Sequence, residues 1–414
     1  MRELLASPEV QRACSFFTTH ADEITRDHIA LCSIPAPPFG EIERARFFEE
    51  KLRLHGLSEV SLDAEGNCLG LRRGEDARGG PIVAASAHLD TVFPRGTNCA
   101  VRADAQGRLH APGIADDSSG LAALLALLKA LEMAHIKTVG SILFAATVGE
   151  EGEGNLRGVR HIFTRGDWAG KIDSFVSFDG PGVERITHIA LGSRRYRVRL
   201  TGAGGHSWGD FGVPNPVHAL GRAIARLAAY PAPRQPRTTF NVGRVAGGTG
   251  ANVIAQEASM DVDLRSQSTA ELQRLDAFFR RAVREAVDDE NNARALQTGP
   301  LTLELKLIGD RPSGETPPHA TLVRLAEEAT RALGHRPVLD CSSTDSNVPI
   351  SLGVPAITLG AGGDSGNSHT LDEWYDPARR ATGLKRALLV LLGAAGMEAR
   401  ELLKDEGGRM KDES

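Results

Sequence analysis

The chain has little cysteine and no cysteine motif typical of a metal or redox site. Its five cysteines are scattered, and no two of them are spaced as Cys-x-x-Cys. An odd, unpatterned set indicates reduced thiols in the cytoplasm rather than a disulfide framework. It also disfavours a purely structural zinc site, which prefers closed sets of cysteine and histidine. We interpret each cysteine as a small buried apolar residue. They are Cys14, Cys32, Cys68, Cys99 and Cys341.

The chain also lacks a surplus of positive charge, a long apolar run and a signal peptide. Its formal net charge is -5 over 414 residues, which indicates neither a nucleic-acid nor a membrane partner. The apolar runs at 121–128 and 387–395 are well under the roughly 18 residues that a membrane span needs. The first residues have no basic start followed by an apolar core. We therefore expect a cytoplasmic protein, and its length favours two domains.

Strands and helices alternate through the first part of the chain. Residues 81–87, 141–148 and 174–178 are short apolar runs typical of buried strands. Residues 41–55, before the first of these runs, have the apolar spacing of a helix. Residues 117–134, between the first two runs, begin with residues that cap helices and continue as an apolar helix. This order predicts βαβ units and a mostly parallel sheet, and thus an α/β fold.

The pattern changes near residue 192 and changes back after residue 308. The intervening segment reads as strand, helix, strand, strand, helix, strand, which is typical of a compact α+β unit. The buried α/β pattern then returns with a helix ending at 333 and an apolar strand at 355–359. We therefore predict that a smaller domain is inserted into a larger one. The predicted segments are 1–192 and 309–414 for the larger domain and 193–308 for the insertion.

Five side chains that can bind metal ions stand at the ends of apolar runs, at a helix start or in a glycine-rich loop. Catalytic residues tend to lie at the carboxyl ends of parallel strands, so we expect these five side chains to converge. Two imidazoles and three carboxylates suit a pair of zinc or similar divalent ions. The five residues are His88, Asp116, Glu151, Asp179 and His369.

Each motif also has a simpler interpretation. His88 alone could be a hydrogen-bonded core histidine. An N-cap explains one of the two acids in Asp116-Asp117, but a buried helix start with two acids needs a cation. Glu150 and Glu151 could belong to a solvated loop, yet they follow a buried strand. That position favours a division of tasks, in which one carboxylate binds metal and its neighbour takes a proton from metal-bound water.

Taken together, these motifs resemble the co-catalytic zinc metallopeptidase and amidohydrolase family of tripeptide aminopeptidase, carboxypeptidase G, succinyl-diaminopimelate desuccinylase and aminoacylase. The resemblance covers about residues 30–390. It implies an α/β/α catalytic domain with an inserted α+β lid or dimerisation domain.

The resemblance also implies a role for each residue of the site. His88 and Asp179 would hold one metal ion, Glu151 and His369 the other, and Asp116 would bridge the two. The remaining two roles are those of the general base and of the acid behind the metal-binding histidine, which fall to Glu150 and Asp90.

Three residues of the insertion resemble positions with known roles in the family. His206 matches a loop histidine that commonly completes a partner subunit's active site and polarises the scissile carbonyl. Asn252 and Arg265 match positions that often bind the substrate carboxylate. Taken alone, these residues read as a loop histidine, a turn asparagine and an exposed arginine at a strand end. We expect a homodimer through the insertion, with 196–200 as an edge strand that pairs across a two-fold axis.

The predicted function is hydrolysis of a peptide or amide bond in a small peptide, as in an aminopeptidase or dipeptidase. The resemblance favours that branch because Asp179 stands where many deacylases carry glutamate. A metal-bridging hydroxide would attack the carbonyl, with Glu150 as general base. The ions would be Zn²⁺, with Co²⁺ or Mn²⁺ as alternatives. Two other functions stay open: deacylation of an N-acyl amino acid, and a catalytically silent member that binds a metabolite or a partner.

Overall fold

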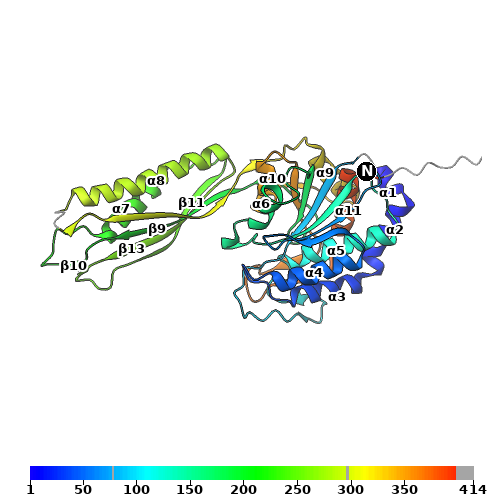
Figure 1. The fold of residues 1–414 in the computed structure, drawn as a ribbon, viewed down its shortest axis with the longest axis horizontal. Helices are drawn as coiled ribbons and strands as arrows, with labels where there is room; N and C mark the ends of the chain where they lie inside the picture. The colour runs from blue at the N-terminus through cyan, green and yellow to red at the C-terminus, as the bar shows by residue number, and fades with distance from the viewer. Residues whose placement is uncertain (77–78, 295–297, 398–414) are drawn as a thin grey trace, which may run out of the picture.

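The computed structural model describes residues 1–76, 79–294 and 298–397, and Figure 1 shows two lobes. The larger lobe is built on a nine-stranded sheet and the smaller lobe on a four-stranded sheet. The chain passes from the larger to the smaller lobe and back again, as the sequence predicted for an inserted domain.

The centre of the large sheet is parallel and its margins are antiparallel. β3 pairs in parallel with β6 and β7, and β7 pairs in parallel with β17. The pairs β1–β2, β2–β6, β17–β8 and β15–β8 are antiparallel, and β16 adds to β8 in parallel. The predicted α/β class with a mostly parallel central sheet is therefore confirmed. The strands lie in the order β1 (Ser58–Leu62), β2 (Cys68–Arg72), β6 (Ser141–Thr147), β3 (Ile82–His88), β7 (Ser174–Phe178), β17 (Ala356–Leu359), β8 (Arg185–Ala190) and β15 (Gly314–Glu315), with β16 (Val338–Ser342) beside β8.

Helices cover both faces of this sheet because its central strands are apolar on both sides. Val83 and Ala85 of β3 face one hydrophobic core, whereas Ala84 faces another. The first core contains residues of α4, α5, α9 and α11, and the second contains residues of α6 and α10. These helices are α4 (Ile42–Leu54), α5 (Ser118–Met133), α6 (Arg157–Thr164), α9 (Thr321–Ala332), α10 (Asn347–Ser351) and α11 (Arg380–Ala395).

Three helices before residue 33 complete the larger lobe, although the sequence analysis predicted no element there. Val10, Phe16 and Ile24 are buried in the first core, against α5 and α11. The helices are α1 (Arg2–Ala6), α2 (Pro8–Thr19) and α3 (Ala21–Cys32).

The smaller lobe is an antiparallel sheet covered on one face by two helices (Figure 1). Its strand order is β11-β13-β9-β14. Short strands β10 and β12 pair at the end of this lobe that lies away from the large sheet. The elements are β9 (Gly192–Thr201), β10 (Gly205–His206), α7 (Pro216–Ala228), β11 (Thr238–Gly247), β12 (Val253–Ile254), β13 (Glu257–Ser266), α8 (Thr269–Asn292) and β14 (Thr302–Arg311).

The prediction that 196–200 form an edge strand is wrong. β9 contains these residues and lies between β13 and β14, pairing with both along most of its length. The alternation of β9 places Tyr196, Val198 and Leu200 in the core under α7 and α8. The alternating pattern therefore arises because helices cover one face of the strand, and it does not indicate a free edge. The edges of this sheet are β11 and β14. The predicted domain limits fall at the start of β9 and near the end of β14.

A third, small sheet lies in the larger lobe and joins two distant loops. β5 pairs with β19, so the loop before α5 lies beside the loop that carries His369. Its order is β18 (Asp364–Gly366), β19 (Trp374–Asp376), β5 (Leu109–His110) and β4 (Arg102–Ala103). Short 3-10 turns cover Gly152–Gly154 and Pro377–Arg379. Across the described ranges, no helix combines the length and hydropathy needed to cross a membrane.

Candidate active site

Three neighbouring parallel strands deliver candidate site residues to one edge of the large sheet. His88 is the last residue of β3, Glu150 and Glu151 follow β6, and Asp179 follows β7. All three strands point the same way, so the side chains at their carboxyl ends share one space. The expected convergence of these residues is seen in the structure.

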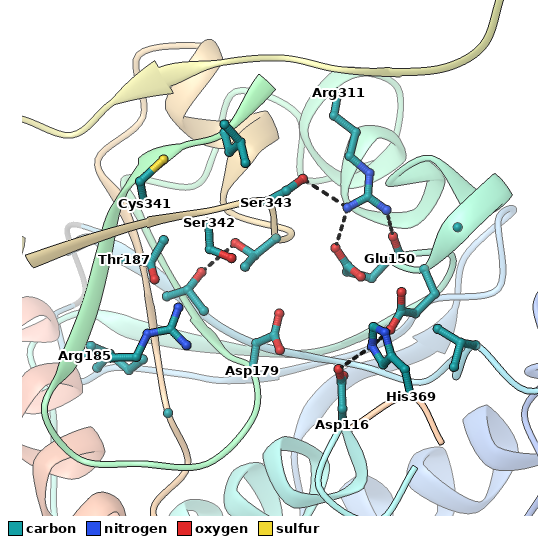
Figure 2. Close-up of a pocket in the computed structure, with 18 of the residues that line it drawn as sticks. Asp116, Glu150, Asp179, Arg185, Thr187, Arg311, Cys341, Ser342, Ser343 and His369 are labelled. Carbon is teal, nitrogen blue, oxygen red and sulfur yellow. Dashed lines mark hydrogen bonds and ion pairs between the residues drawn. The ribbon is translucent and has the colours of Figure 1, made fainter. Parts of the chain in front are cut away.

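A cavity of about 500 Å³ opens at this edge. Its lining includes Asp116, Glu150, Glu151, Asp179 and His369, and Figure 2 shows four of these side chains pointing toward the shared space. Asp116 precedes α5, and His369 lies in the loop between β18 and β19. Residues separated by more than 250 positions therefore meet at one site.

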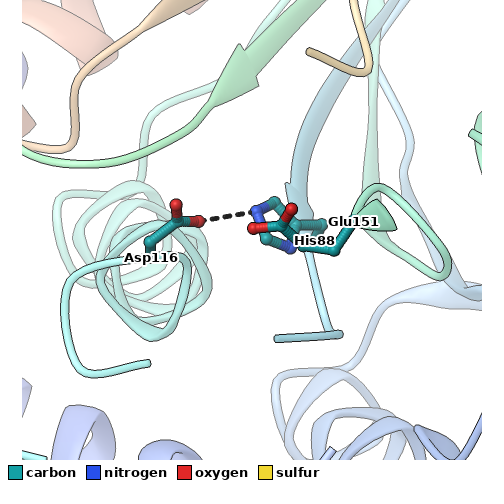
Figure 3. A group of neighbouring side chains, drawn as sticks. All are labelled: His88, Asp116 and Glu151. Atoms are coloured by element: carbon teal, nitrogen blue, oxygen red, sulfur yellow. Dashed lines mark hydrogen bonds and ion pairs between the residues drawn. The ribbon is translucent and has the colours of Figure 1, made fainter. Parts of the chain in front are cut away.

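The carboxylate of Asp116 lies between the two histidines. Its Oδ1 is 2.9 Å from Nε2 of His88, and its Oδ2 is 3.0 Å from Nε2 of His369 (Figures 2 and 3). Nε2 of His369 is also 3.1 Å from Oε1 of Glu151. Ligand atoms of His88, Asp116 and Glu151 all lie within 4.8 Å of one another. Each oxygen of Asp116 thus faces a different imidazole.

The donor set and its burial fit divalent cations. Burial, and after it the negative charge of Asp116, raise the pKa of Asp179 to about 7. Burial also raises the pKa of Glu150 well above its ordinary value, although Arg311 opposes this change. Several carboxylates share one buried space, and cations compensate such a cluster. His88 and His369 add the imidazole ligands that zinc and similar ions accept.

Protons compete with cations for the two candidate histidines. Hydrogen bonds to Asp116 and Glu151 raise the pKa of His369 to about 10. Burial works to lower the pKa of His88, but the hydrogen bond to Asp116 and the charges of Asp117, Asp116 and Asp90 raise it well above its ordinary value. A metal ion requires a neutral imidazole, so its binding must release these protons.

We therefore expect metal affinity to rise with pH. Below pH 10 the free His369 is protonated, so each unit of rising pH should tighten the ion bound there about tenfold per proton released. Calorimetric titration with Zn²⁺ between pH 6 and pH 8, in buffers of different ionisation enthalpy, measures the released protons. An affinity that is independent of pH would contradict the assignment of His88 and His369 as ligands.

Asp90 holds the main chain of the loop after β6. It is fully buried, and its two carboxylate oxygens accept hydrogen bonds from the backbone N–H groups of Glu150 and Glu151, at 3.0 and 2.8 Å. Nδ1 of His88 instead lies 2.9 Å from the backbone oxygen of Asp90, and 3.7 Å from its carboxylate. The backbone of Asp90 therefore orients the second nitrogen of His88, while the Asp90 side chain fixes the backbone of Glu150 and Glu151.

Two further buried acids position the segment before α5. Asp117 caps α5 by accepting from the N–H of Gly120 at 3.1 Å, and it also accepts from the N–H of His88 at 3.0 Å. Glu373 accepts from the N–H groups of Ala115 and Asp116, at 2.8 and 3.0 Å. The sequence analysis found no role for Glu373, which has no local motif of its own.

Residues 84–392 match Peptidase family M20/M25/M40. This chain belongs to that family. Membership confirms the family predicted from the motifs.

Three proteins illustrate what this chain is similar to in sequence or in fold. Succinyl-diaminopimelate desuccinylase of Burkholderia ambifaria is 28% identical over 248 residues, which are 55% of this chain and 64% of the relative, so less than two thirds of that protein is spanned. The aminopeptidase PepT of Bacillus cereus has the same fold, with a TM-score of 0.74, 21% identity, and coverage of 90% of this chain and 98% of that one. The YXEP protein of Bacillus subtilis, described as a dinuclear metal binding peptidase of the M20 family, has a TM-score of 0.66 at 18% identity, over 92% and 99% of the two chains.

The three site residues predicted in the M20 insertion lie in two different places. Arg265, at the end of β13, lines the cavity together with the metal-binding candidates. His206 and Asn252 are exposed at the far end of the smaller lobe, in and beside the β10–β12 pair (Figure 1). Neither residue is among the described residues that line the cavity. Within one chain, therefore, His206 and Asn252 stand apart from the M20 site.

Proposed function

We propose that this protein is a dinuclear metal-dependent hydrolase that cleaves a peptide or amide bond of a small peptide, as an aminopeptidase or dipeptidase. The observation that carries the proposal is the placement of Asp116 between His88 and His369, with the carboxylate of Glu150 at the same cavity. A carboxylate shared by two imidazoles suits a bridging ligand, and a neighbouring carboxylate that binds no imidazole suits a base. The likeness in fold to an aminopeptidase supports the peptidase branch.

The proposed ligands divide into two sets that share Asp116. His88 and Asp179 would hold one ion, and Glu151 and His369 the other. Zn²⁺ is the proposed ion, with Co²⁺ or Mn²⁺ as alternatives, because imidazole and carboxylate accept all three. Such a pair of ions would polarise the scissile carbonyl and lower the pKa of a bound water.

The residues of the chain would perform the remaining tasks. Glu150 takes the proton of the attacking water and returns it to the leaving amine. Arg265 binds the substrate carboxylate through its planar guanidinium group. Asn252 lies beside His206 at the far end of the smaller lobe, so it would assist from a second copy of the chain. His206 donates a hydrogen bond to the oxygen on which negative charge develops.

A deacylase of N-acyl amino acids is the second candidate. The curated relatives are desuccinylases, and the same machinery would serve an acylated amine. The difference would reside in the cavity wall, where Arg185 and the hydroxyls of Thr187 and Ser342 face the substrate space (Figure 2). A catalytically silent role is disfavoured because all five ligands and the base are present.

The deciding experiment compares substrates on the metal-loaded protein. A panel of dipeptides, tripeptides and N-acyl amino acids should give turnover chiefly with the peptides. Turnover with N-acyl amino acids alone would replace the peptidase with the deacylase. No turnover in the panel, with both metal ions bound, would overturn the proposed function.

We further propose that the protein acts as a cytoplasmic homodimer through its smaller lobe. The edges of that lobe's sheet, β11 and β14, can each pair with a second copy. His206 belongs to β10, at the end of the smaller lobe away from the large sheet (Figure 1), and it is not among the described residues that line the cavity, so it would act in the partner's site. The cytoplasmic location is supported by five cysteines that form no disulfide.

Mixing two inactive variants tests the action of His206 in trans. After subunit exchange between His206→Ala and Glu150→Gln, a mixed dimer has one site with both defects and one with neither, so up to about half of the wild-type activity per mixed dimer should return. The control mixes His206→Ala with the double variant His206→Ala/Glu150→Gln. No site in that mixture has an intact His206, so no activity should return. Recovery in neither mixture would leave closure within one chain as the remaining account.

A further inference from the structure

Arg311 is the last residue of β14, the strand by which the chain leaves the smaller lobe. Its Nη1 donates to Oε1 of Glu150 at 2.9 Å and to Oγ of Ser343 at 3.1 Å, and its Nη2 donates to the backbone oxygen of Glu150 (Figure 2). Arg311 and Glu150 are only 6% and 5% exposed. One guanidinium thus binds the side chain and the main chain of the same glutamate.

These contacts orient Glu150 without using both of its oxygens. Its backbone N–H is held by Asp90 at 3.0 Å, and Arg311 holds its carbonyl and Oε1. Among the described residues no hydrogen bond to Oε2 is formed. One oxygen of the carboxylate is therefore anchored, and the other is left for a proton.

The contacts also argue against a role for Arg311 as a substrate anchor. Nη1 already donates to two acceptors, Glu150 and Ser343, and Nη2 donates to a carbonyl. A bidentate grip on a substrate carboxylate needs two free, parallel N–H groups. Arg265, which comes from β13, lines the same cavity and is more exposed, so it is better placed for that task.

The connection between the lobes continues this contact. The N–H of Asp310 donates to Oδ1 of Asn155 at 2.8 Å, and Nη1 of Arg195 donates to the backbone oxygen of Gly152 at 3.4 Å. Both acceptors belong to the loop that carries Glu150. The ends of β9 and β14 nearest the large sheet therefore rest on the loop of the base.

We propose that Arg311 is the positioning residue of Glu150 and ties the proposed base to the strand that returns from the smaller lobe. This inference rests on the proposed function, in which Glu150 is the base. The planar guanidinium group of arginine can donate to a carboxylate and a carbonyl at the same time. The ammonium group of lysine is a compact point charge and lacks this fixed geometry.

The kinetic test uses Arg311→Met and Arg311→Lys on the peptide or N-acyl amino acid that the wild type hydrolyses best. Arg311→Met should lower kcat by about 10²-fold, since a small misplacement of a catalytic group can cost that much, while KM stays within about twofold. The kcat of Arg311→Lys should lie between that of the wild type and that of Arg311→Met. Added guanidinium ion should restore part of the rate of Arg311→Met, and ammonium should not.

Arg194→Met is the matched control. Arg194 lies on β9 and pairs with Asp310 beside Arg311, but it does not contact Glu150. Its kcat should stay near the wild-type value. Equal losses in Arg194→Met and Arg311→Met would reduce Arg311 to a structural contact. A raised KM with unchanged kcat would make Arg311 a substrate-binding residue, and unchanged kinetics would also overturn the proposal.

Thermal unfolding of the metal-free protein tests the pair without relying on activity. Arg311→Met leaves Glu150 buried and unpaired, which should lower the unfolding midpoint by on the order of 5 °C. Adding Glu150→Gln to that variant should recover part of the loss. Additive shifts would overturn the pairing itself. If the wild type hydrolyses nothing in the panel, the proposed function fails, and this cycle still decides whether Arg311 and Glu150 are coupled.

Discussion

Glu150→Gln is expected to keep both metal ions and to lose turnover by about 10²–10⁴-fold. Glutamine has the same shape and can still accept from Arg311 through its amide oxygen, but it cannot take a proton from water. No hydrogen bond or ion pair joins Glu150 to His88 or His369 in the described part of the chain, whereas Glu151 pairs with His369. Metal analysis of the purified variant, together with kcat on the best substrate of the panel, measures both parts of this expectation.

The neighbouring glutamates supply the controls. Glu153→Gln changes an exposed residue of the same loop and should leave kcat unchanged. Glu151→Gln should weaken metal binding instead, so excess zinc should partly restore its activity. Wild-type turnover in a metal-replete Glu150→Gln protein would remove Glu150 from the mechanism.

Asp116→Ala is expected to disturb both metal sites, whereas His369→Ala should chiefly affect one. The reason is that each oxygen of Asp116 faces a different imidazole. Loss of a direct ligand should lower the affinity for an ion by at least about 10²-fold, because even a residue that hydrogen-bonds to a ligand contributes about 10–100-fold to metal affinity. Titration with Zn²⁺ against a competing chelator gives the number of sites and the affinity of each.

Asp372→Ala serves as the control for this pair of variants. Asp372 is exposed and lies three residues beyond His369, in the same loop. It should bind both ions as the wild type does. Two intact sites in Asp116→Ala would mean that Asp116 bridges nothing and contributes only to the start of α5.

Local patterns were enough to locate the candidate ligands. His88 ends an apolar strand, and Glu151 and Asp179 follow two others. Charged side chains are rarely buried at such places unless they have a partner. Because β6, β3 and β7 run parallel, their carboxyl ends must meet at one edge, so the convergence of these residues followed from the sequence pattern as well. The strand and helix order of the insertion was also predictable, because it depends on periodicity within single elements.

The sequence pattern could not predict contacts between distant segments. Glu373 reaches the N–H of Asp116 across 257 positions, and Arg311 reaches Glu150 across 161. No motif marks either residue, since an isolated charge in a loop or at a strand end is usually solvated.

Strand order was equally hidden. The alternation of Tyr196, Val198 and Leu200 showed that one face of β9 is covered, but period two is the same in a central strand and an edge strand. The sequence by itself determined the family and the fold class, and it supplied the candidate residues of the site. Only the tertiary structure decided which strand is central, which acid supports which backbone N–H, and which arginine holds the base, because these depend on how separate elements pack together.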